Sequence, residues 1–313
     1  SEVCFLVFTA MTLAIIFAGV ENGIERVSRF MMPILVVLSL VISVYSVTRP
    51  GALEGVKYFL VPNLKNFSWM TVVAAMGQMF YSLSIAMGIL ITFGSYMKKD
   101  VSIEDSTRNV EVFDTAIAIM AGLMIIPAVF AFSGGDPAAL KAGPALMFIT
   151  IPKVFDSMGL GTVIGVAFFL LVLFAALTSS IALTESAVST LQDELGWIRR
   201  KSTTIMGVSM VALGSLSSLG YGPLANVTII GMQFLDFFDF LTNSVMMPIA
   251  AIASCILVSR VIGVDRIARE VTLNGCSFRR ERVFNAMIRV LCPVFAAVIL
   301  ISSIANAFGW ISM

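Results

Sequence analysis

Histidine is absent from this chain of 313 residues, and cysteine occurs only four times. Without histidine there is no Ser-His-Asp triad and no zinc site that depends on imidazole ligands. No enzyme is expected, since Ser179 and Ser180 have no lysine or histidine base within the predicted spans. The cysteines form no obvious disulfide pair, so we expect them to serve packing. They are Cys4, Cys255, Cys276 and Cys292.

Charge is also scarce, since charged residues make up 12% of the chain and hydrophobic residues 58%. The mean hydropathy is +0.98, and a soluble core has no room for so much apolar surface. The net charge of +1, without a basic stripe, gives no electrostatic case for binding nucleic acid. The lipid bilayer is therefore the expected environment.

Long apolar stretches fill the chain, and each reaches or approaches the roughly 20 residues that span the hydrocarbon of a bilayer. Backbone polar groups in lipid must bond internally, so helices are expected throughout. We predict an all-α polytopic membrane protein with about eight transmembrane helices. The stretches are 3–19, 30–48, 71–97, 110–133, 161–190, 203–220, 230–259 and 286–311.

Basic residues gather in every second connection, and the positive-inside rule places such connections in the cytoplasm. Both ends then lie outside, so an odd number of spans is expected before Ser1. We therefore expect a fragment of a longer multi-pass protein of the cell inner (plasma) membrane. The basic clusters are Arg26 with Arg29, Lys98 with Lys99 and Arg108, Arg199 to Lys201, and the arginines from Arg260 to Arg289.

A hydroxyl-rich run, 175–180, lies inside the predicted span 161–190, where unpartnered polar groups are costly. On a helix Ala175, Thr178 and Ser179 stand at i, i+3 and i+4, so they share one face. Their oxygens suit a hard monovalent cation. The alternative is that the hydroxyls bond back to carbonyls one turn earlier.

The run 80–88 in the predicted span 71–97 is rich in small and polar residues. This composition predicts the helix that breaks most easily halfway across the membrane. A break frees backbone carbonyls and amides, which transporters use for sodium and for an anionic substrate group. The alternative is close packing between helices.

Ionisable residues inside apolar spans are functional candidates by default. Asp114 lies early in the span 110–133, and its alternative role is a protonated carboxyl bonded to a neighbouring helix. Glu185 either lines an inner water pathway or pairs with the basic residues of the inner surface. Asp236 and Asp239 lie near the outer end of their span, where Asp236 suits a solvated helix start.

Several motifs of this chain, in the same order, resemble one known family. The run from Gly77 through Tyr81-Ser82-Leu83-Ser84 to Ser95-Tyr96 resembles the sixth helix of the neurotransmitter:sodium symporter family, particularly of its bacterial amino acid transporters. The resemblance runs from the family's fourth helix to its eleventh. The other motifs are 143–152 in the long outer loop, 174–180 in the eighth helix, Asp193-Glu194-Leu195 after it, and Gly23 with Pro33.

The resemblance implies a partial inverted-repeat fold, leucine-transporter-like, that lacks the first three helices. Residues 1–313 then form a single transmembrane domain fragment. Within it, 1–48 is the end of the first repeat, 71–259 the second inverted repeat and 284–313 an accessory helix. The missing N-terminal helices of the same protein are expected partners, and this chain alone is expected to be inactive.

The resemblance also implies two sodium sites. The second site takes the carbonyl of Ala175 and the hydroxyls of Thr178 and Ser179. The first site takes Ser82 and the residue at position 114, where the family usually has Asn and this chain has Asp114. A carboxylate there supplies the negative charge that chloride-dependent relatives take from chloride, so chloride is not expected to be required.

Substrate contacts follow from the same resemblance. Tyr81 corresponds to the aromatic lid over a bound amino acid, with Ser82 beside it, and Ser84 to a backbone contact for the amino group. Met87 and Leu183 correspond to the walls of the side-chain pocket, which Ser179 also borders. A neutral, apolar amino acid is the expected substrate.

Asp239 corresponds to the acidic partner in the outer gate, together with the lid Tyr81. Gly23 and Pro33 correspond to positions that open water access from the inside. The alternative is a loop glycine before a helix with an early proline. The function implied is sodium-coupled amino acid symport by alternating access in the full-length protein. A non-transporting membrane sensor or assembly protein, and a sodium-independent exchanger, are the alternatives.

Overall fold

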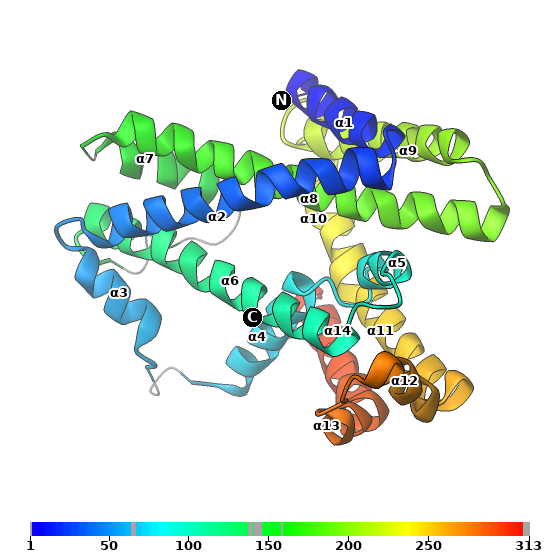
Figure 1. The fold of residues 1–313 in the computed structure, drawn as a ribbon. Helices are drawn as coiled ribbons and strands as arrows, with labels where there is room; N and C mark the ends of the chain where they lie inside the picture. The colour runs from blue at the N-terminus through cyan, green and yellow to red at the C-terminus, as the bar shows by residue number, and fades with distance from the viewer. Residues whose placement is uncertain (1, 64–66, 137–139, 141–145, 158, 309–313) are drawn as a thin grey trace. The chain divides into compact units, whose positions relative to one another are not determined.

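The structure is a computed structural model, and it describes residues 2–63, 67–136, 140, 146–157 and 159–308. Within these ranges the chain is helical apart from short connections and one isolated β-bridge between Ile229 and Met232. The helices are α1 Glu2–Phe17, α2 Arg26–Val47, α3 Ala52–Leu60, α4 Trp69–Ser82, α5 Ile89–Ser95, α6 Ile103–Ser133, α7 Ile151–Asp156, α8 Gly161–Leu195, α9 Arg199–Gly220, α10 Phe234–Asp239, α11 Met247–Ile256, α12 Val264–Val271, α13 Glu281–Ala286 and α14 Cys292–Ala307 (Figure 1).

Wider, π-helical turns connect several of these helices into longer rods. α10 and α11 join into one apolar helix, and α13 joins α14 in the same way. The π-helical stretches are Val20–Glu25, Leu146–Thr150, Phe240–Met246, Leu257–Ile262 and Met287–Leu291.

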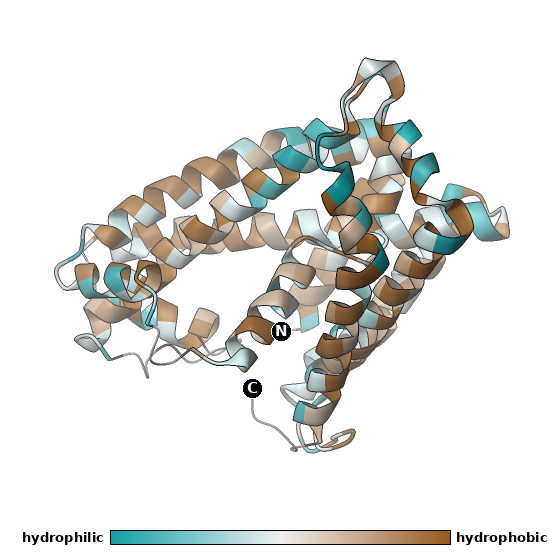
Figure 2. Cartoon of the chain, turned by 90° about the horizontal axis from the view of Figure 1, so that it is seen from below, coloured by the Kyte–Doolittle hydropathy of each residue, from teal (hydrophilic) through white to brown (hydrophobic). Residues whose placement is uncertain are grey.

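Six helical rods in the described residues are long and apolar enough to cross a membrane, which confirms the predicted all-α membrane class. Figure 2 shows hydrophobic residues along much of these rods and hydrophilic ones mostly at their ends and connections. Of the other predicted spans, 3–19 forms the shorter α1, and 71–97 is divided between α4 and α5. The rods are Val20–Val47, Ile103–Ser133, Gly161–Leu195, Arg199–Gly220, Phe234–Ile262 and Glu281–Ala307.

Several helices extend beyond the predicted apolar stretches into charged sequence. α6 begins at Ile103 rather than near 110, with Glu104 and Asp105 in its first turn, where carboxylates interact well with the helix dipole. α8 continues to Leu195 rather than 190. The short helices α3 and α12 were not predicted, because each is too short to span a bilayer.

The chain forms two compact units, and α6 and α8 contribute residues to both. The first unit comprises 1–17, 68–111 and 181–313, and the second comprises 18–67 and 112–180. In the second unit α2, α6, α7 and α8 surround an apolar core in which the rings of Phe155 and Phe168 meet edge to face at 5.4 Å. The predicted repeat boundaries remain a prediction.

Small residues let helices approach closely in both units. In the first unit α1 packs along α9 (Figure 1), and a Cβ atom built at Gly207 would lie 2.8 Å from Leu13. In the second unit a Cβ atom at Gly55 of α3 would lie 2.8 Å from the Cα atom of Pro127 in α6. Such contacts are the usual basis of helix packing in membranes, where the hydrophobic effect does not drive helices together.

Candidate ion and substrate site

The predicted break in the span 71–97 is present. α4 ends at Ser82 and α5 begins at Ile89, and the two are separate helices (Figure 1). Between them Ser84 and Ala86 adopt left-handed backbone conformations, with φ of 54° and 63°, which cost of order 1 kcal/mol each in residues with a side chain. Strained backbone of this kind is typical of functional sites.

Local hydrogen bonds hold the broken segment in place. The amide of Ser84 donates to the carbonyl of Tyr81 at 3.0 Å, and the amide of Ile85 donates to the carbonyl of Phe80 at 3.1 Å. Gly88 adopts φ of 79° and caps α5. A Cβ atom at Gly88 would lie 2.8 Å from the Oγ atom of Ser186, so only glycine suits both its conformation and its contact.

Four of the proposed substrate residues lie at the end of α4 or within this break. Tyr81 is 50% exposed and Ser82 is exposed at the end of α4, while Ser84 and Met87 are partly buried within the break. Leu183 is exposed on α8 in the same unit. Their roles toward a substrate remain predictions.

In the hydroxyl-rich run of α8, a hydroxyl bonds back to carbonyls one turn earlier, which is the alternative to ion binding. The Thr178 hydroxyl donates to the carbonyls of Phe174 and Ala175, both at 3.0 Å. Ser179 is exposed. Donation uses the hydroxyl hydrogen and leaves the oxygen lone pairs of Thr178 for a cation, so back-bonding and ion coordination are compatible.

Asp114 is partly buried on α6, which runs without a break through this region. It belongs to the second unit, as do Ala175, Thr178 and Ser179, whereas Ser82 belongs to the first. Among the described residues no three Cys, Asp or Glu side chains converge in a metal-binding group. The donors that the sequence offers are carbonyl, hydroxyl and single carboxylate oxygens, which fit sodium rather than a transition metal.

The predicted gate residues lie at three different kinds of position. Gly23 is buried in the π-helical stretch Val20–Glu25, where the backbone already departs from the α-helix. Pro33 is exposed inside α2, which continues through it. Asp239 is exposed at the end of α10 and accepts a hydrogen bond from the Asn243 side chain at 2.5 Å.

Part of the outer-loop motif, residues 143–145, lies outside the described residues, as do residues 309–311 of the last predicted span. The remaining residues of the motif are helical. Leu146–Thr150 forms a π-helical turn and Ile151–Asp156 forms α7. Ile151 and Val154 are buried in the core of the second unit, so this part of the motif serves packing.

The first unit contains a buried ion pair whose basic residue was not predicted. Glu185 of α8 is fully buried, and both its oxygens bind the Arg199 guanidinium at the start of α9, at 3.0 and 2.6 Å. The Tyr96 hydroxyl donates to the same carboxylate at 2.8 Å. Arg199 also donates to the carbonyl of Ile16 near the end of α1. Of the two alternatives for Glu185, pairing with a basic residue is the one observed.

These contacts join α1, the end of α5, α8 and α9. A paired, fully hydrogen-bonded charge avoids the high cost of an isolated one in an apolar environment. The signal in the sequence was a carboxylate inside a span, which requires a partner. The identity of that partner depends on tertiary structure, since Arg199 is only one of several nearby basic residues.

Comparison with known proteins agrees with the sequence motifs. Residues 2–309 match the model of the sodium:neurotransmitter symporter family. The chain is 32% identical over 301 residues to the uncharacterized sodium-dependent transporter YhdH of Bacillus subtilis (strain 168). It is also 32% identical over 300 residues to an uncharacterized sodium-dependent transporter of Haemophilus influenzae.

A solved structure shares the fold. The crystal structure of MhsT in complex with L-phenylalanine superimposes with a TM-score of 0.82 at 34% identity, covering 95% of this chain and 66% of that one. Each alignment with the two bacterial transporters covers 96% of this chain. It covers only 66% of the first relative and 64% of the second. This chain therefore spans just under two thirds of their length.

The predicted leucine-transporter-like fold is confirmed by this likeness, and the apolar helices agree with the predicted multi-pass protein of the plasma membrane. The break in the helix, the hydroxyl-rich run and the family model all point to the same assignment. The chain belongs to the sodium:neurotransmitter symporter family, which is a family of transporters and not of enzymes.

Proposed function

We propose that the complete carrier to which this chain belongs couples the entry of sodium to the uptake of a neutral, apolar amino acid. Family membership supports sodium coupling. The likeness to MhsT, whose structure contains L-phenylalanine, supports an apolar amino acid substrate. L-phenylalanine is therefore the first substrate to test.

The broken helix between α4 and α5 is the observation that carries this proposal. It is a strained arrangement in which residues 83–88 leave the α-helical conformation within an apolar segment. Irregular backbone is not tolerated against lipid, so we expect it to line a protein-enclosed site in the complete carrier. The backbone groups of such a segment are suited to bind the substrate and the coupling ion.

Two sodium ions are proposed. Ala175, Thr178 and Ser179 contribute oxygens to one ion, and Ser82 and Asp114 contribute to the other. The carboxylate of Asp114 balances the charge of the ion in this first site without chloride, because two opposite charges in contact attract strongly in a medium of low dielectric constant. Transport is then independent of chloride.

Coupling follows from shared charge neutralisation. Sodium and the substrate carboxylate neutralise one another, so each raises the affinity of the carrier for the other. The closed state is favoured when both are bound, and the inward sodium gradient drives net uptake. Sites that bound the two ligands independently would not couple them.

We further propose that residues outside this chain complete both ion sites, so that the chain alone is inactive. Its coverage of 64–66% of the curated relatives supports this view. Proteoliposomes that contain the full-length carrier should accumulate radiolabelled L-phenylalanine with sodium outside and potassium inside. Proteoliposomes that contain only residues 1–313 should not.

The same vesicles distinguish the alternative functions. A sodium-independent exchanger would show counterflow that is unchanged when choline replaces sodium. A sensor or assembly protein would show neither uptake nor counterflow with any apolar amino acid. Sodium-dependent uptake that persists with gluconate in place of chloride is the result expected here.

A further inference from the structure

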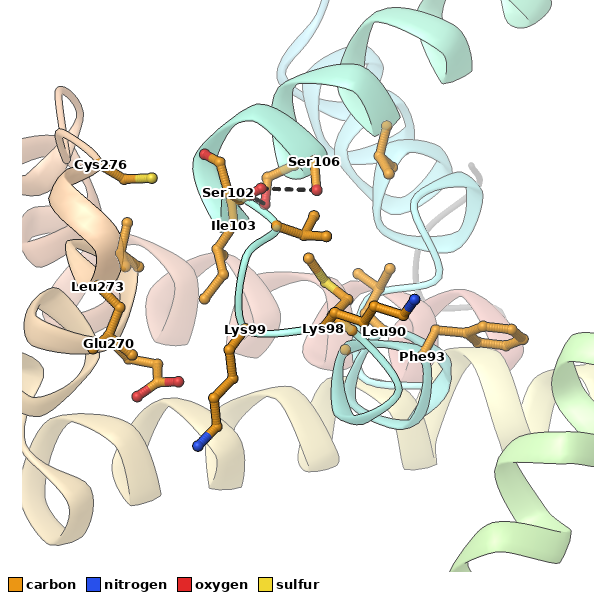
Figure 3. A pocket seen from close by; sticks show the side chains of 16 residues that line it. Leu90, Phe93, Lys98, Lys99, Ser102, Ile103, Ser106, Glu270, Leu273 and Cys276 are labelled. Atoms are coloured by element: carbon orange, nitrogen blue, oxygen red, sulfur yellow. Dashed lines mark hydrogen bonds between the residues drawn. The ribbon is translucent and has the colours of Figure 1, made fainter. Parts of the chain in front are cut away.

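Two adjoining cavities lie between α5, the start of α6 and the connection that follows α12, all within the first unit. The larger has a volume of about 440 Å³ and a largely apolar lining. Figure 3 shows Leu90 and Phe93 on one side of it and Leu273 and Cys276 on the opposite side. Ser102 and Ser106 lie between these two sides and are joined by a hydrogen bond.

The second cavity, of about 380 Å³, has a polar lining. The basic residues that line it are all arginines, and Glu104 and Asp105 contribute carboxylates. Ser102 and Cys276 line both cavities, so the polar one opens next to the apolar one. The arginines are Arg108, Arg279 and Arg280.

The arginines of the polar cavity are not equally available to a ligand. Arg280 forms an ion pair with Glu111 at 2.7 Å, and hydrogen bonding to Glu111 raises the pKa of Arg280. Glu104 accepts the backbone amide of Arg279 at 2.9 Å, which leaves the guanidinium of Arg279 to other partners. In the described part of the chain, Arg108 and Arg279 form no salt bridge.

The cavities lie where charged sequence gives way to apolar sequence. α6 carries Glu104, Asp105 and Arg108 before its apolar run, and α13 begins with Glu281 and Arg282 after Arg280. This is the level of lipid headgroups in a membrane helix. The positive-inside rule predicts that this side faces the cytoplasm, where the membrane leaflet is rich in anionic lipid.

We propose that the paired cavities form a binding site for an anionic phospholipid of the inner leaflet. Arg108 and Arg279 bind the phosphate headgroup, since guanidinium groups form paired hydrogen bonds with phosphate oxygens. One acyl chain lies against Leu90, Phe93 and Leu273. Basic pockets between membrane helices on the cytoplasmic side suit such headgroups, and the adjacent apolar cavity suits the chain.

Native mass spectrometry of the full-length protein tests this site. The probes are phosphatidylglycerol, which is anionic, and phosphatidylethanolamine, which has no net charge. The double variant R108Q/R279Q should bind phosphatidylglycerol about tenfold more weakly than the parent. The matched control R200Q/R266Q removes the same charge from exposed arginines outside both cavities and should bind as the parent does.

A second variant tests the apolar cavity. L273W should fill the space for the acyl chain and weaken binding of phosphatidylglycerol, while R108K/R279K should retain most of it. The proposal is overturned if the control pair loses as much affinity as R108Q/R279Q, or if both lipids bind equally. It is also overturned if soluble glycerol phosphate competes as well as the lipid, because the site would then bind phosphate alone.

Discussion

At the scale of single residues, Thr178 shows how a hydroxyl that bonds to its own helix keeps lone pairs for the proposed ion. Its hydrogen satisfies carbonyls of the preceding turn, and its lone pairs point away from that bond. An exposed Ser179 beside it adds a second oxygen. A hydroxyl in such a position is useful to a cation only if other ligands complete the shell.

Replacing Thr178 with alanine should raise the sodium concentration for half-maximal uptake about tenfold, because one oxygen ligand worth about 1.4 kcal/mol is lost. The measurement is a sodium titration of L-phenylalanine uptake by the full-length carrier. Thr190→Ala is the matched control, since Thr190 lies on the same helix and donates to the carbonyl of Ser186 in the same way. Equal sodium titrations for both variants would show that Thr178 does not bind the ion.

Asp114→Asn should make transport depend on chloride. The neutral amide keeps an oxygen for the first sodium ion but removes the charge that balances it. Uptake by the variant should be low in gluconate and partly restored in chloride, whereas the parent is unaffected by the exchange. If the variant is fully active in both, Asp114 has a structural role only.

At the scale of elements, the break between α4 and α5 is the feature that departs most from regular structure. Two residues with side chains adopt the left-handed region there, and nearby turn bonds keep them in it. The strain must be offset by the surrounding packing, which includes the contact of Gly88 with Ser186. The local sequence therefore favours a break, and the rest of the unit fixes its shape.

Ala86→Gly should stabilise the full-length carrier by about 1 kcal/mol, because glycine adopts a positive φ without the clash of a Cβ atom. Ala74→Gly, in the regular and exposed part of α4, should instead destabilise it by about 0.5–1 kcal/mol. Thermal unfolding in detergent measures both. A loss of stability in Ala86→Gly would mean that the flexibility of glycine outweighs the relief of strain.

The elements were predictable to different degrees. The spans followed from apolar length, and the break followed from small and polar residues at 82–88. The early start of α6 could not be predicted from apolar length, because its first turn is charged and is stabilised by the helix dipole rather than by burial. The partner of Glu185 could not be predicted either, because Arg199 reaches it only through the packing of α8 and α9 against α1.

At the scale of the whole molecule, charge distribution and buried pairs govern how the chain lies in the membrane and how stable it is. Basic connections are predicted to face the cytoplasm. The buried pair of Glu185 and Arg199 fixes four helices to one another within the first unit. Exposed pairs such as that of Arg280 and Glu111 have a much smaller effect, since solvent screens them.

The predicted orientation has a direct test by cysteine labelling in intact cells. A membrane-impermeant maleimide should label a cysteine placed at Ala225, in the connection without basic residues, when added from outside. It should label the native Cys276 only after the cells are opened. Labelling of Cys276 in intact cells would reverse the orientation.

Glu185→Gln should destabilise the carrier by about 3 kcal/mol, because it leaves the Arg199 charge, only 25% exposed, without its counterion. Glu111→Gln removes a comparable pair whose side chains are 56% and 45% exposed, and should change stability by less than about 1 kcal/mol. Thermal unfolding compares the two. Equal effects would mean that the buried pair is effectively solvated.

The asymmetry of the Glu185 and Arg199 pair has an evolutionary consequence. A guanidinium keeps its charge in proteins, so a lineage that loses the glutamate first leaves the largely buried charge of Arg199 without a counterion. A lineage that loses the arginine first retains a carboxyl group, which can take up a proton and become neutral. Relatives without this pair should therefore include intermediates that keep the acid alone, and those that keep only the arginine should be rare.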